Sequence, residues 1–381
     1  MLSHALPAHL AKLQQQGIYR QRCVADHASV INFSSNDYLS LAAEQSIQHA
    51  YQTGFQRYPA GSSASIMAGG YHAVHHAVEQ AFKTALGVDD CILFTSGYAA
   101  NLSVANLLGH LQATVVIDKR VHASIYDGLK LGGARYVRYL HNDLADLLTK
   151  IKATTNTAVI TESVFSMSGQ LAPLAAMATL CGAHHSELIV DEAHAFGILG
   201  PQGLGAVAQH QLTQEDVPLR MIPLGKAYAA CGAIVAGSRV WIDALLQSAR
   251  PAIYSTALSP AFAHGLLATL DIVRAADQRR KKLQNLSNYF RQAVTHSPLK
   301  WRDSSSPIQQ LQLGCPHQAL AYAQTLRQQS IICLPIRQPT VSKLESGLRI
   351  VLNYHHQPED IDKLFKCLLA ISLKIGDEIK I

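Results

Sequence analysis

The sequence predicts an α/β protein with a central, mostly parallel sheet of about seven strands and a smaller C-terminal α/β domain. Two observations carry this prediction. Short runs rich in Val, Ile and Leu recur between helical stretches without polar alternation, which is typical of strands covered on both faces. After about residue 277 this pattern of apolar runs between helical stretches gives way to shorter, partly alternating segments. We therefore expect an N-terminal segment at residues 1–38, a large domain at 39–277 and a small domain at 278–381.

The individual elements follow from hydrophobic spacing. Residues 71–87 place apolar side chains at i, i+3 and i+4, and Gly87 stands where a helix stop is expected. Apolar runs predict the strands of the large domain at residues 91–95, 114–117, 135–139, 158–161, 188–190, 221–224 and 233–236. In the small domain we expect strands at 308–313, 331–336 and 348–353, and helices at 318–329 and from Pro358 onward.

Composition narrows the class of protein. Only 15% of the 381 residues are charged, below the usual share of about 25%, which indicates surface hidden in a large core or against a second subunit. No apolar run reaches the 18 or so residues needed to cross a bilayer, and the N-terminus lacks the features of a secretory signal. We therefore expect a cytosolic oligomer without a membrane partner.

Other residue types point away from metal and disulfide chemistry. The seven scattered cysteines contain no CxxC pair and predict free thiols, most of them buried. The basic run at residues 279–282 is interpreted as a solvated helix face, with a docking patch for an acidic partner as the lesser alternative. Histidines at 72, 75, 76, 184, 185, 355 and 356 have no acidic or thiol partner nearby in the sequence, so we expect solvated side chains and no metal.

Polar residues at strand ends are the candidate site, because ligands of open α/β sheets lie beyond the carboxyl ends of the strands. Ser96 and Gly97 follow one strand and open a helix, whose free amides could hold a phosphate. The same pair is compatible with an ordinary strand-to-helix turn. His122 and Ser166 follow two further strands, where an imidazole could stack on a flat ring and a hydroxyl could bind it.

Asp191 ends a wholly apolar strand, and His194 lies three residues on. A carboxylate there needs a cationic or hydrogen-bonding partner. Three interpretations fit these two residues: a pocket in which His194 is a second donor to a bound ligand, an Asp/His metal pair, and the Asp-Glu-Ala-His string of RNA helicases. The helicase hypothesis requires a GxxxxGK[ST] phosphate loop, but Arg220 and Ala227 stand at its first glycine and its hydroxyl position. We therefore expect no nucleic-acid partner.

Lys226 follows a short apolar strand, and desolvation there would favour its neutral, nucleophilic amine. A snorkelling surface lysine is the alternative. Taken together, the strand ends suit a ligand with a phosphate, a protonatable ring nitrogen, a flat face and an aldehyde. Pyridoxal 5'-phosphate has all four. Asp191 would hold the ring nitrogen, His194 the ring oxygen and Lys226 the aldehyde.

The order of these residues resembles the α-oxoamine synthase family of fold type I pyridoxal phosphate enzymes. The resemblance rests on Ser96-Gly97-Tyr98, His122, Ser166, Asp191 with His194, and Gly225-Lys226, and on the strings at residues 32–39, 253–256, 336–341 and 348–350. It covers almost the whole chain. Within the family, the similarity is greatest to the members that condense L-alanine with a pimeloyl thioester, on acyl carrier protein or coenzyme A, in the biotin pathway.

The resemblance implies further roles and a homodimer. Gly97, Tyr98, His122, Ser166, Asp191, His194 and Lys226 would contact the cofactor, and Ser255 and Thr256 would reach the phosphate of the neighbouring subunit. Lys226 would also remove the α-proton of alanine. Arg349 would bind the amino acid carboxylate, His122 would help orient the acyl substrate, and Arg20 and Thr340 would meet the pimeloyl chain.

Three positions depart from the family pattern. Pro223 stands where relatives usually have a threonine or serine that binds the cofactor phosphate, and Ala229 replaces a common glycine. The loop at residues 61–65 is poorer in glycine than its counterpart. Two alternative functions remain open at this point: a family member using glycine with a short acyl thioester, and a non-catalytic relative that keeps the fold.

Overall fold

The computed structural model describes residues 2–22, 24 and 30–378, and divides the chain into two compact units. The large unit comprises Asp37–Ser166 and Leu171–Arg280. The small unit comprises Met1–Asn36, Met167–Gln170 and Lys281–Ile381. No helix among the described residues combines the length and apolar character needed to cross a bilayer.

The large unit is built on a seven-stranded sheet in the order β2-β8-β7-β6-β5-β3-β4. Its strands are β2 (Asp90–Phe94), β3 (Thr114–Asp118), β4 (Arg135–Tyr139), β5 (Thr157–Glu162), β6 (Glu187–Asp191), β7 (Leu219–Pro223) and β8 (Ala233–Gly237). Only β8 runs against its neighbours. Every residue of β3 and β5 is buried, so the expectation of a mostly parallel sheet covered on both faces is confirmed.

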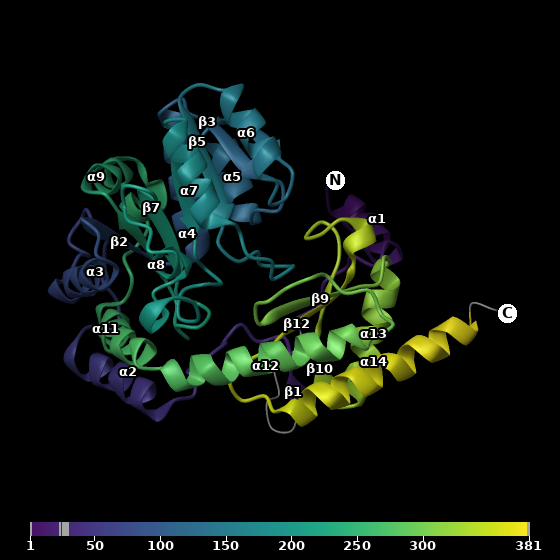
Figure 1. Cartoon of the computed structure of the whole chain (residues 1–381). Helices are drawn as coiled ribbons and strands as arrows, with labels where there is room; N and C mark the ends of the chain where they lie inside the picture. Colours follow the sequence, from purple (N-terminus) through teal and green to yellow (C-terminus); the bar gives the residue numbers. More distant parts are fainter. Residues whose placement is uncertain (1, 23, 25–29, 379–381) are drawn as a thin grey trace. The chain divides into compact units, whose positions relative to one another are not determined.

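Helices of the large unit flank this sheet, either directly or through other helices (Figure 1). They are α2 (Gln45–Arg57), α3 (Ala73–Leu86), α4 (Gly97–His110), α5 (Ala123–Leu131), α6 (Leu144–Lys152), α7 (Leu174–Ala183), α8 (Ala206–Gln209), α9 (Arg239–Ser248), α10 (Arg250–Ile253) and α11 (Pro260–Arg274), with a 3-10 turn at Pro201–Gly203. Helix α4 packs against β2, β7 and β8, and α6 packs against β3 and β4. Gly87 ends α3 in the left-handed conformation, as its position predicted.

The small unit contains two short sheets. Strand β1 (Ile31–Asn32) pairs in parallel with β10 (Ile331–Ile332), and β11 (Leu334–Ile336), β12 (Gly347–Val351) and β9 (Ile308–Gln312) form an antiparallel sheet. Its helices are α1 (Leu2–Gln15), α13 (Pro316–Gln328) and α14 (Pro358–Glu378), with a 3-10 turn at Lys343–Glu345. Helix α12 (Asp277–Thr295) begins in the large unit and continues into the small one. The single strand expected at 331–336 is two strands, because the chain passes from one sheet to the other there.

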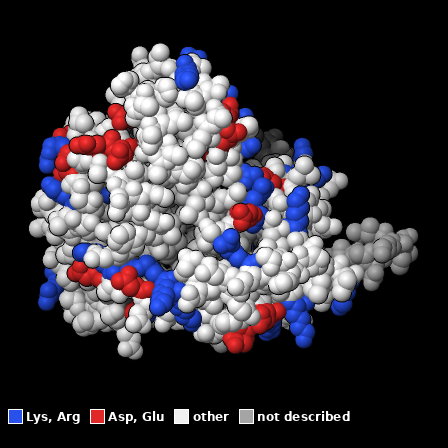
Figure 2. All heavy atoms as spheres, in the orientation of Figure 1, with Lys and Arg blue, Asp and Glu red and all other residues white. Residues whose placement is uncertain are grey.

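The interpretation of residues 279–282 as a solvated face is wrong for its two arginines. Arg280 is buried and donates to the carbonyls of Gly197 and Val273, and Arg279 donates to the carbonyl of Leu39 and forms an ion pair with Glu44. These guanidinium groups donate hydrogen bonds to backbone carbonyl oxygens inside the protein instead of facing solvent. On the face shown in Figure 2, basic and acidic side chains are interspersed.

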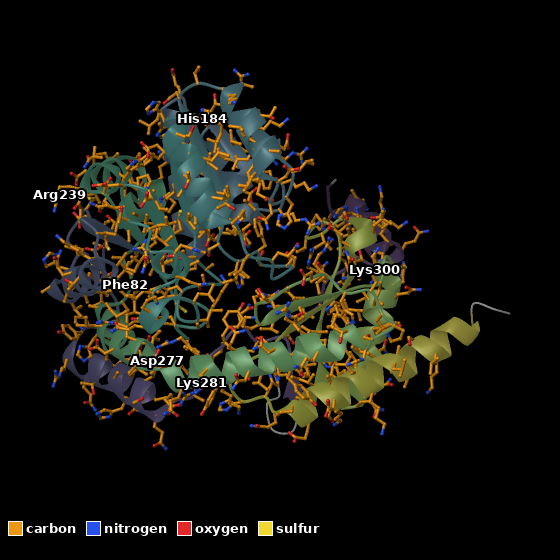
Figure 3. All side chains as sticks on the ribbon, in the orientation of Figure 1. Phe82, His184, Arg239, Asp277, Lys281 and Lys300 are labelled. Carbon is orange, nitrogen blue, oxygen red and sulfur yellow. The ribbon has the colours of Figure 1, made fainter. Side chains whose placement is uncertain are left out.

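Cysteine and histidine predictions have mixed outcomes. Cysteines 91, 181 and 333 are buried, 315 and 367 are half-buried and 231 is exposed, while Cys23 lies outside the described residues. His184 and His185 are exposed near the end of α7, as expected (Figure 3 shows His184). The expectation of solvation is wrong for His75 and His356, which are buried. The ring of His356 stacks on Phe33, with centroids 4.3 Å apart. Packing and hydrogen bonds account for the burial of these two histidines.

Candidate functional site

The carboxyl ends of the parallel strands bring the predicted polar residues of the large unit to one edge of the sheet. Glu162 at the end of β5 lies in register with Asp191 at the end of β6, and Asp191 is in register with Met221 on β7. Because parallel strands share their direction, the segments that follow them start from the same edge. This edge is the candidate active site.

Asp191 is a buried carboxylate that is held by a backbone N–H group and by a side-chain amide. Its Oδ1 accepts from the amide of Ala193 at 2.8 Å, and its Oδ2 accepts from Nδ2 of Asn101 at 2.6 Å. A carboxylate has about four acceptor positions, so a ring N–H can still be accommodated. Asn101, which the sequence did not single out, comes from α4 and reaches the carboxylate because α4 packs on this sheet.

His122 caps the N-terminus of α5. Its Nδ1 lies 2.7 Å from Oγ of Ser124 and 3.3 Å from the backbone nitrogen of Ser124, while the side chain as a whole remains exposed. The pKa of His122 lies below its ordinary value, chiefly because the surrounding protein desolvates the ring nitrogens. The negative charge of Asp191 acts in the opposite direction and raises this pKa. Lys226 lowers this pKa further.

His194 is buried and fixed by Tyr38. The hydroxyl of Tyr38, itself fully buried, lies 2.6 Å from Nδ1 of His194, and the two rings meet edge to face. In the sequence, Tyr38 stands within the family string at residues 32–39 and has no role of its own. The burial of Tyr38 is known only from the structure, so no local pattern in the sequence could have identified this partner.

Lys226 lies on a tight turn after β7. The amide of Ala229 donates to the carbonyl of Lys226 at 2.8 Å, and the amide of Ala230 donates to the carbonyl of Leu224 at 3.0 Å. The turn requires a left-handed backbone at Ala229, with a φ of 56°. The half-buried Lys226 acts electrostatically on both His122 and Glu162, so its amine lies in the same cluster of charges.

Glu162 is a site residue that sequence reasoning missed. Its side chain is buried, and its Oε2 accepts from the amide of Ser166 at 2.9 Å. Burial and the nearby charge of Asp191 raise its pKa to about 8. Ser166 is buried beside it. The position of Glu162 at the end of β5, opposite Asp191, could have been predicted only with the strand register known.

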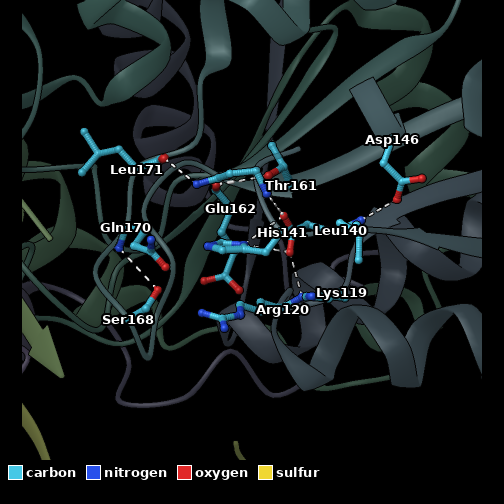
Figure 4. Close-up of polar contacts among 12 residues, drawn as sticks. Lys119, Arg120, Leu140, His141, Asp146, Thr161, Glu162, Ser168, Gln170 and Leu171 are labelled. Atoms are coloured by element: carbon cyan, nitrogen blue, oxygen red, sulfur yellow. Dashed lines mark hydrogen bonds and ion pairs between the residues drawn. The ribbon is translucent and has the colours of Figure 1, made fainter. Parts of the chain in front are cut away.

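Asp118, the last residue of β3, bonds to a different histidine from the one that follows it in sequence. Its two carboxylate oxygens lie 3.1 and 3.0 Å from Nδ1 of His141, and its Oδ2 also accepts from the amide of Asn142 (Figure 4). The ring of His141 packs edge to face on Phe165, with centroids 4.3 Å apart. This pair therefore joins the end of β3 to the segment after β4 and leaves His122 to Ser124.

The start of α4 is a capped strand-to-helix turn, and its role as an anion cradle stays a prediction. The Ser96 hydroxyl caps the helix by accepting from the amide of Ala99 at 3.1 Å, and Gly97 is the first helical residue. A β-carbon at Gly97 would lie 2.6 Å from the ring of Pro223, so the helix start touches the end of β7. Tyr98 is half-exposed, and its hydroxyl donates to Asp127.

Ser255 and Thr256 lie exposed between α10 and α11 of the large unit. The remaining predicted residues belong to the small unit. Arg349 is buried on β12, and its Nη1 donates to Oδ1 of Asn36 at 3.0 Å. Arg20 is exposed and lies close enough to Arg337 for its charge to lower the pKa of that guanidinium, after the larger effect of burial. The amide of the exposed Thr340 donates to the carbonyl of Arg337 at 3.0 Å.

Asp191 and His194, the metal pair considered from the sequence, bond to other residues in the structure. Within residues 2–22, 24 and 30–378, no group of three or more His, Cys, Asp or Glu side chains could hold a metal ion. The Asp191/His194 metal pair considered from the sequence is therefore disfavoured, since His194 bonds to Tyr38 and Asp191 to Asn101.

Comparison with known proteins identifies the family. The sequence profile of class I and II aminotransferases matches residues 28–368. The 8-amino-7-oxononanoate synthase of Marinobacter nauticus is 39% identical over 366 residues, which cover 93% of each chain. The chain belongs to the 8-amino-7-oxononanoate synthase family, within the class I and II aminotransferases.

Solved structures agree with this family assignment. The 8-amino-7-oxononanoate synthase of Francisella tularensis superposes with a TM-score of 0.82 at 30% identity, over 93% of this chain and all of the other. A serine palmitoyltransferase of Sphingomonas wittichii gives a TM-score of 0.90 at 24% identity, over 98% of this chain and 97% of that one. The second likeness shows a shared fold. The resemblance drawn from the sequence is confirmed at the level of the family and the fold type.

Proposed function

We propose that this protein catalyses the pyridoxal 5'-phosphate-dependent condensation of L-alanine with a pimeloyl thioester to 8-amino-7-oxononanoate, releasing carbon dioxide and a thiol in biotin synthesis. The observation that carries the proposal is the gathering of Asp191, His122 and Lys226 at one sheet edge in a chain of this family. The acyl group of the thioester is carried by acyl carrier protein or coenzyme A.

The residues of the large unit fit the cofactor. Free amides at the start of α4 suit a phosphate, and Gly97 has no β-carbon to obstruct its approach. Asp191 keeps acceptor capacity for a ring N–H, His194 and Ser166 supply groups for a ring oxygen, and the imidazole of the exposed His122 can stack on the ring. When bound, pyridoxal phosphate supplies an electron sink for negative charge at the α-carbon of the amino acid.

The chain's own residues then bind, orient and move protons. We propose that Nζ of Lys226 holds the cofactor and removes the α-proton of alanine, a role for which a poised amine beside other ionisable groups is suited. Asp191 keeps the ring nitrogen protonated through its negative charge. Arg349, held by Asn36, binds the alanine carboxylate through its planar fork of donors.

A second group of residues, in the small unit, would select the acyl substrate. Arg20, Arg337 and Thr340 lie together in the small unit, and Arg337 is anchored to the carbonyl of Gly17 at 2.7 Å. Two guanidinium groups suit the far carboxylate of a pimeloyl chain, which an acetyl chain lacks. This arrangement favours a pimeloyl over a short acyl thioester.

The proposed form of the enzyme is a cytoplasmic homodimer. The exposed Ser255 and Thr256 suit a role at the phosphate of a partner subunit. Mixing inactive Lys226→Ala and Ser255→Ala/Thr256→Ala proteins tests this idea, because a shared site should restore part of the activity in mixed dimers. Two proteins that stay inactive together, while dimeric by sedimentation, would contradict it.

The decisive test of the function has two parts. Borohydride reduction of the protein saturated with pyridoxal phosphate, followed by peptide mass spectrometry, should place the pyridoxyl group on Lys226. Lys226→Ala should abolish the label, and Lys119→Ala, an exposed lysine after β3, should not. Turnover should then be faster with alanine than with glycine, and faster with pimeloyl than with acetyl thioesters. A label on Lys226 without product from either pair would favour the non-catalytic alternative.

A further inference from the structure

A chain of hydrogen bonds connects His122 with Asp191 through two residues that have no assigned role. Nδ1 of His122 lies 2.7 Å from Oγ of Ser124, which lies 3.1 Å from Nδ2 of Asn101. The same Nδ2 lies 2.6 Å from Oδ2 of Asp191. Ser124 is fully buried, and Asn101 and Asp191 are each 3% exposed. The chain therefore runs through protein rather than through solvent.

The direction of each bond can be deduced from its chemistry. An amide nitrogen only donates, so Nδ2 of Asn101 uses its two hydrogens on Asp191 and Ser124. The backbone N–H of Ser124 also donates, and it points to Nδ1 of His122 at 3.3 Å. Nδ1 must then be the nitrogen without a proton, and the Ser124 hydroxyl donates to it as well. The proton of the neutral ring is on Nε2.

We propose that Ser124 and Asn101 are positioning residues that hold His122 as its neutral Nε2–H tautomer and bind Asp191 in its ionised form. The inference rests on the proposed function, in which His122 faces cofactor and acyl substrate. A neutral ring with a fixed Nε2–H stacks on the cofactor without adding a second cation beside Lys226, and it presents one donor to a carbonyl oxygen of the acyl group.

The surrounding charges agree with a neutral ring. Asp191 and Asp127 favour the protonated form of His122, whereas Lys226 and desolvation oppose it, and the balance lowers the pKa of His122. Asp127 also accepts a hydrogen bond from Tyr98. Oδ1 of Asn101 has no hydrogen-bond partner within the described part of the chain, which leaves the amide nitrogen as the group that bonds at this position.

The tautomer can be measured directly by NMR on protein labelled with 15N-histidine, with His122→Gln used to assign the signals. Wild-type protein should show a pyridine-like Nδ1 and a pyrrole-like Nε2 at residue 122, both without cofactor and with it. In Ser124→Ala we expect a mixture of the two tautomers and a higher pKa for His122, because a donor to the neutral form is lost. Ser124→Thr keeps a hydroxyl and should restore the wild-type pattern.

Ser103→Ala is the matched control, since Ser103 is a buried serine of α4 whose hydroxyl has no partner among the described residues. It should leave the His122 signals unchanged. Catalytic efficiency should fall about 10-fold in Ser124→Ala, as for loss of one hydrogen bond, and return in Ser124→Thr. Asn101→Ala should in addition weaken cofactor binding, because Asp191 loses a donor.

A protonated Nδ1 in the wild-type protein would overturn the inference, as would a Ser124→Ala spectrum identical to that of Ser103→Ala. If Ser124→Ala does not fold, the wild-type tautomer and the comparison with Ser124→Thr still decide the question. The NMR measurement needs no turnover. If trapping fails to label Lys226, the proposed function is lost while the tautomer result stands.

Discussion

Gly97 and Pro223 approach each other so closely that a β-carbon on Gly97 would lie 2.6 Å from two ring carbons of Pro223. The relationship joins the start of α4, which is the candidate phosphate cradle, to the end of β7, which precedes Lys226. It also explains a departure from the family pattern in physical terms. A proline at 223 fills space at Gly97 but offers no hydroxyl to an anion.

Pro223→Thr should bind pyridoxal phosphate more tightly than the wild-type protein. The added hydroxyl can donate to the phosphate, and one hydrogen bond to a charged acceptor is worth about 1.5 to 3 kcal/mol, or about ten- to a hundredfold in affinity. Absorbance titration gives the dissociation constant of each protein. Pro223→Ala, which removes the ring without adding a hydroxyl, is the control. An unchanged dissociation constant in Pro223→Thr would show that the hydroxyl does not reach the phosphate.

Gly97→Ala should destabilise the large unit. The new methyl group would overlap Pro223, and such overpacking costs about 1 to 3 kcal/mol. Gly225→Ala is a matched control at the same edge, because its nearest neighbour would be 3.5 Å away. Chemical denaturation should therefore separate the two variants. Equal free energies of unfolding would mean that α4 shifts to admit the methyl group at no cost.

Ala229→Gly should stabilise the protein by about 1 kcal/mol. A residue with a β-carbon is strained at a φ of 56°, and glycine adopts this conformation freely. Ala230→Gly, one residue further along the same turn, should instead destabilise, since that residue has no positive φ and only gains freedom in the unfolded chain. The free energy of unfolding measures both. Destabilisation by both substitutions would contradict a strained turn beneath Lys226.

Glu162→Gln should flatten the pH dependence of stability. Burial and the charge of Asp191 raise the pKa of Glu162 to about 8, whereas in the unfolded chain the carboxyl loses its proton near 4.5. Between these values the folded state binds one more proton, so stability falls as pH rises, until both states are ionised above about 8. Glutamine removes this contribution.

Denaturation at pH values near both ends of that range tests the prediction. Wild-type protein and the control Glu215→Gln, an exposed residue, should lose more stability toward alkaline pH than Glu162→Gln. A parallel pH dependence of all three proteins would show that Glu162 is ionised in the folded state near neutrality.

The sequence by itself determined the order of elements and proposed most of the candidate site residues. Apolar runs without polar alternation indicated strands such as β3 and β5, because a strand buried on both faces leaves no room for polar side chains. The spacing of Asp191, His194 and Lys226 indicated the chemistry, because residues that follow parallel strands start from one edge. Resemblance to a family added Arg20, Thr340 and Arg349.

Only the tertiary structure decided which side chains bond to one another. Asn101 bonds to Asp191, which lies 90 residues further along the chain, and Tyr38 bonds to His194, 156 residues further along. Glu162 lies opposite Asp191, 29 residues away, through the register of β5 against β6. No local pattern encodes such pairings. They depend on strand order, which arises from the packing of the whole sheet. The burial of Arg280 and the pairing of Asp118 with His141 have the same origin.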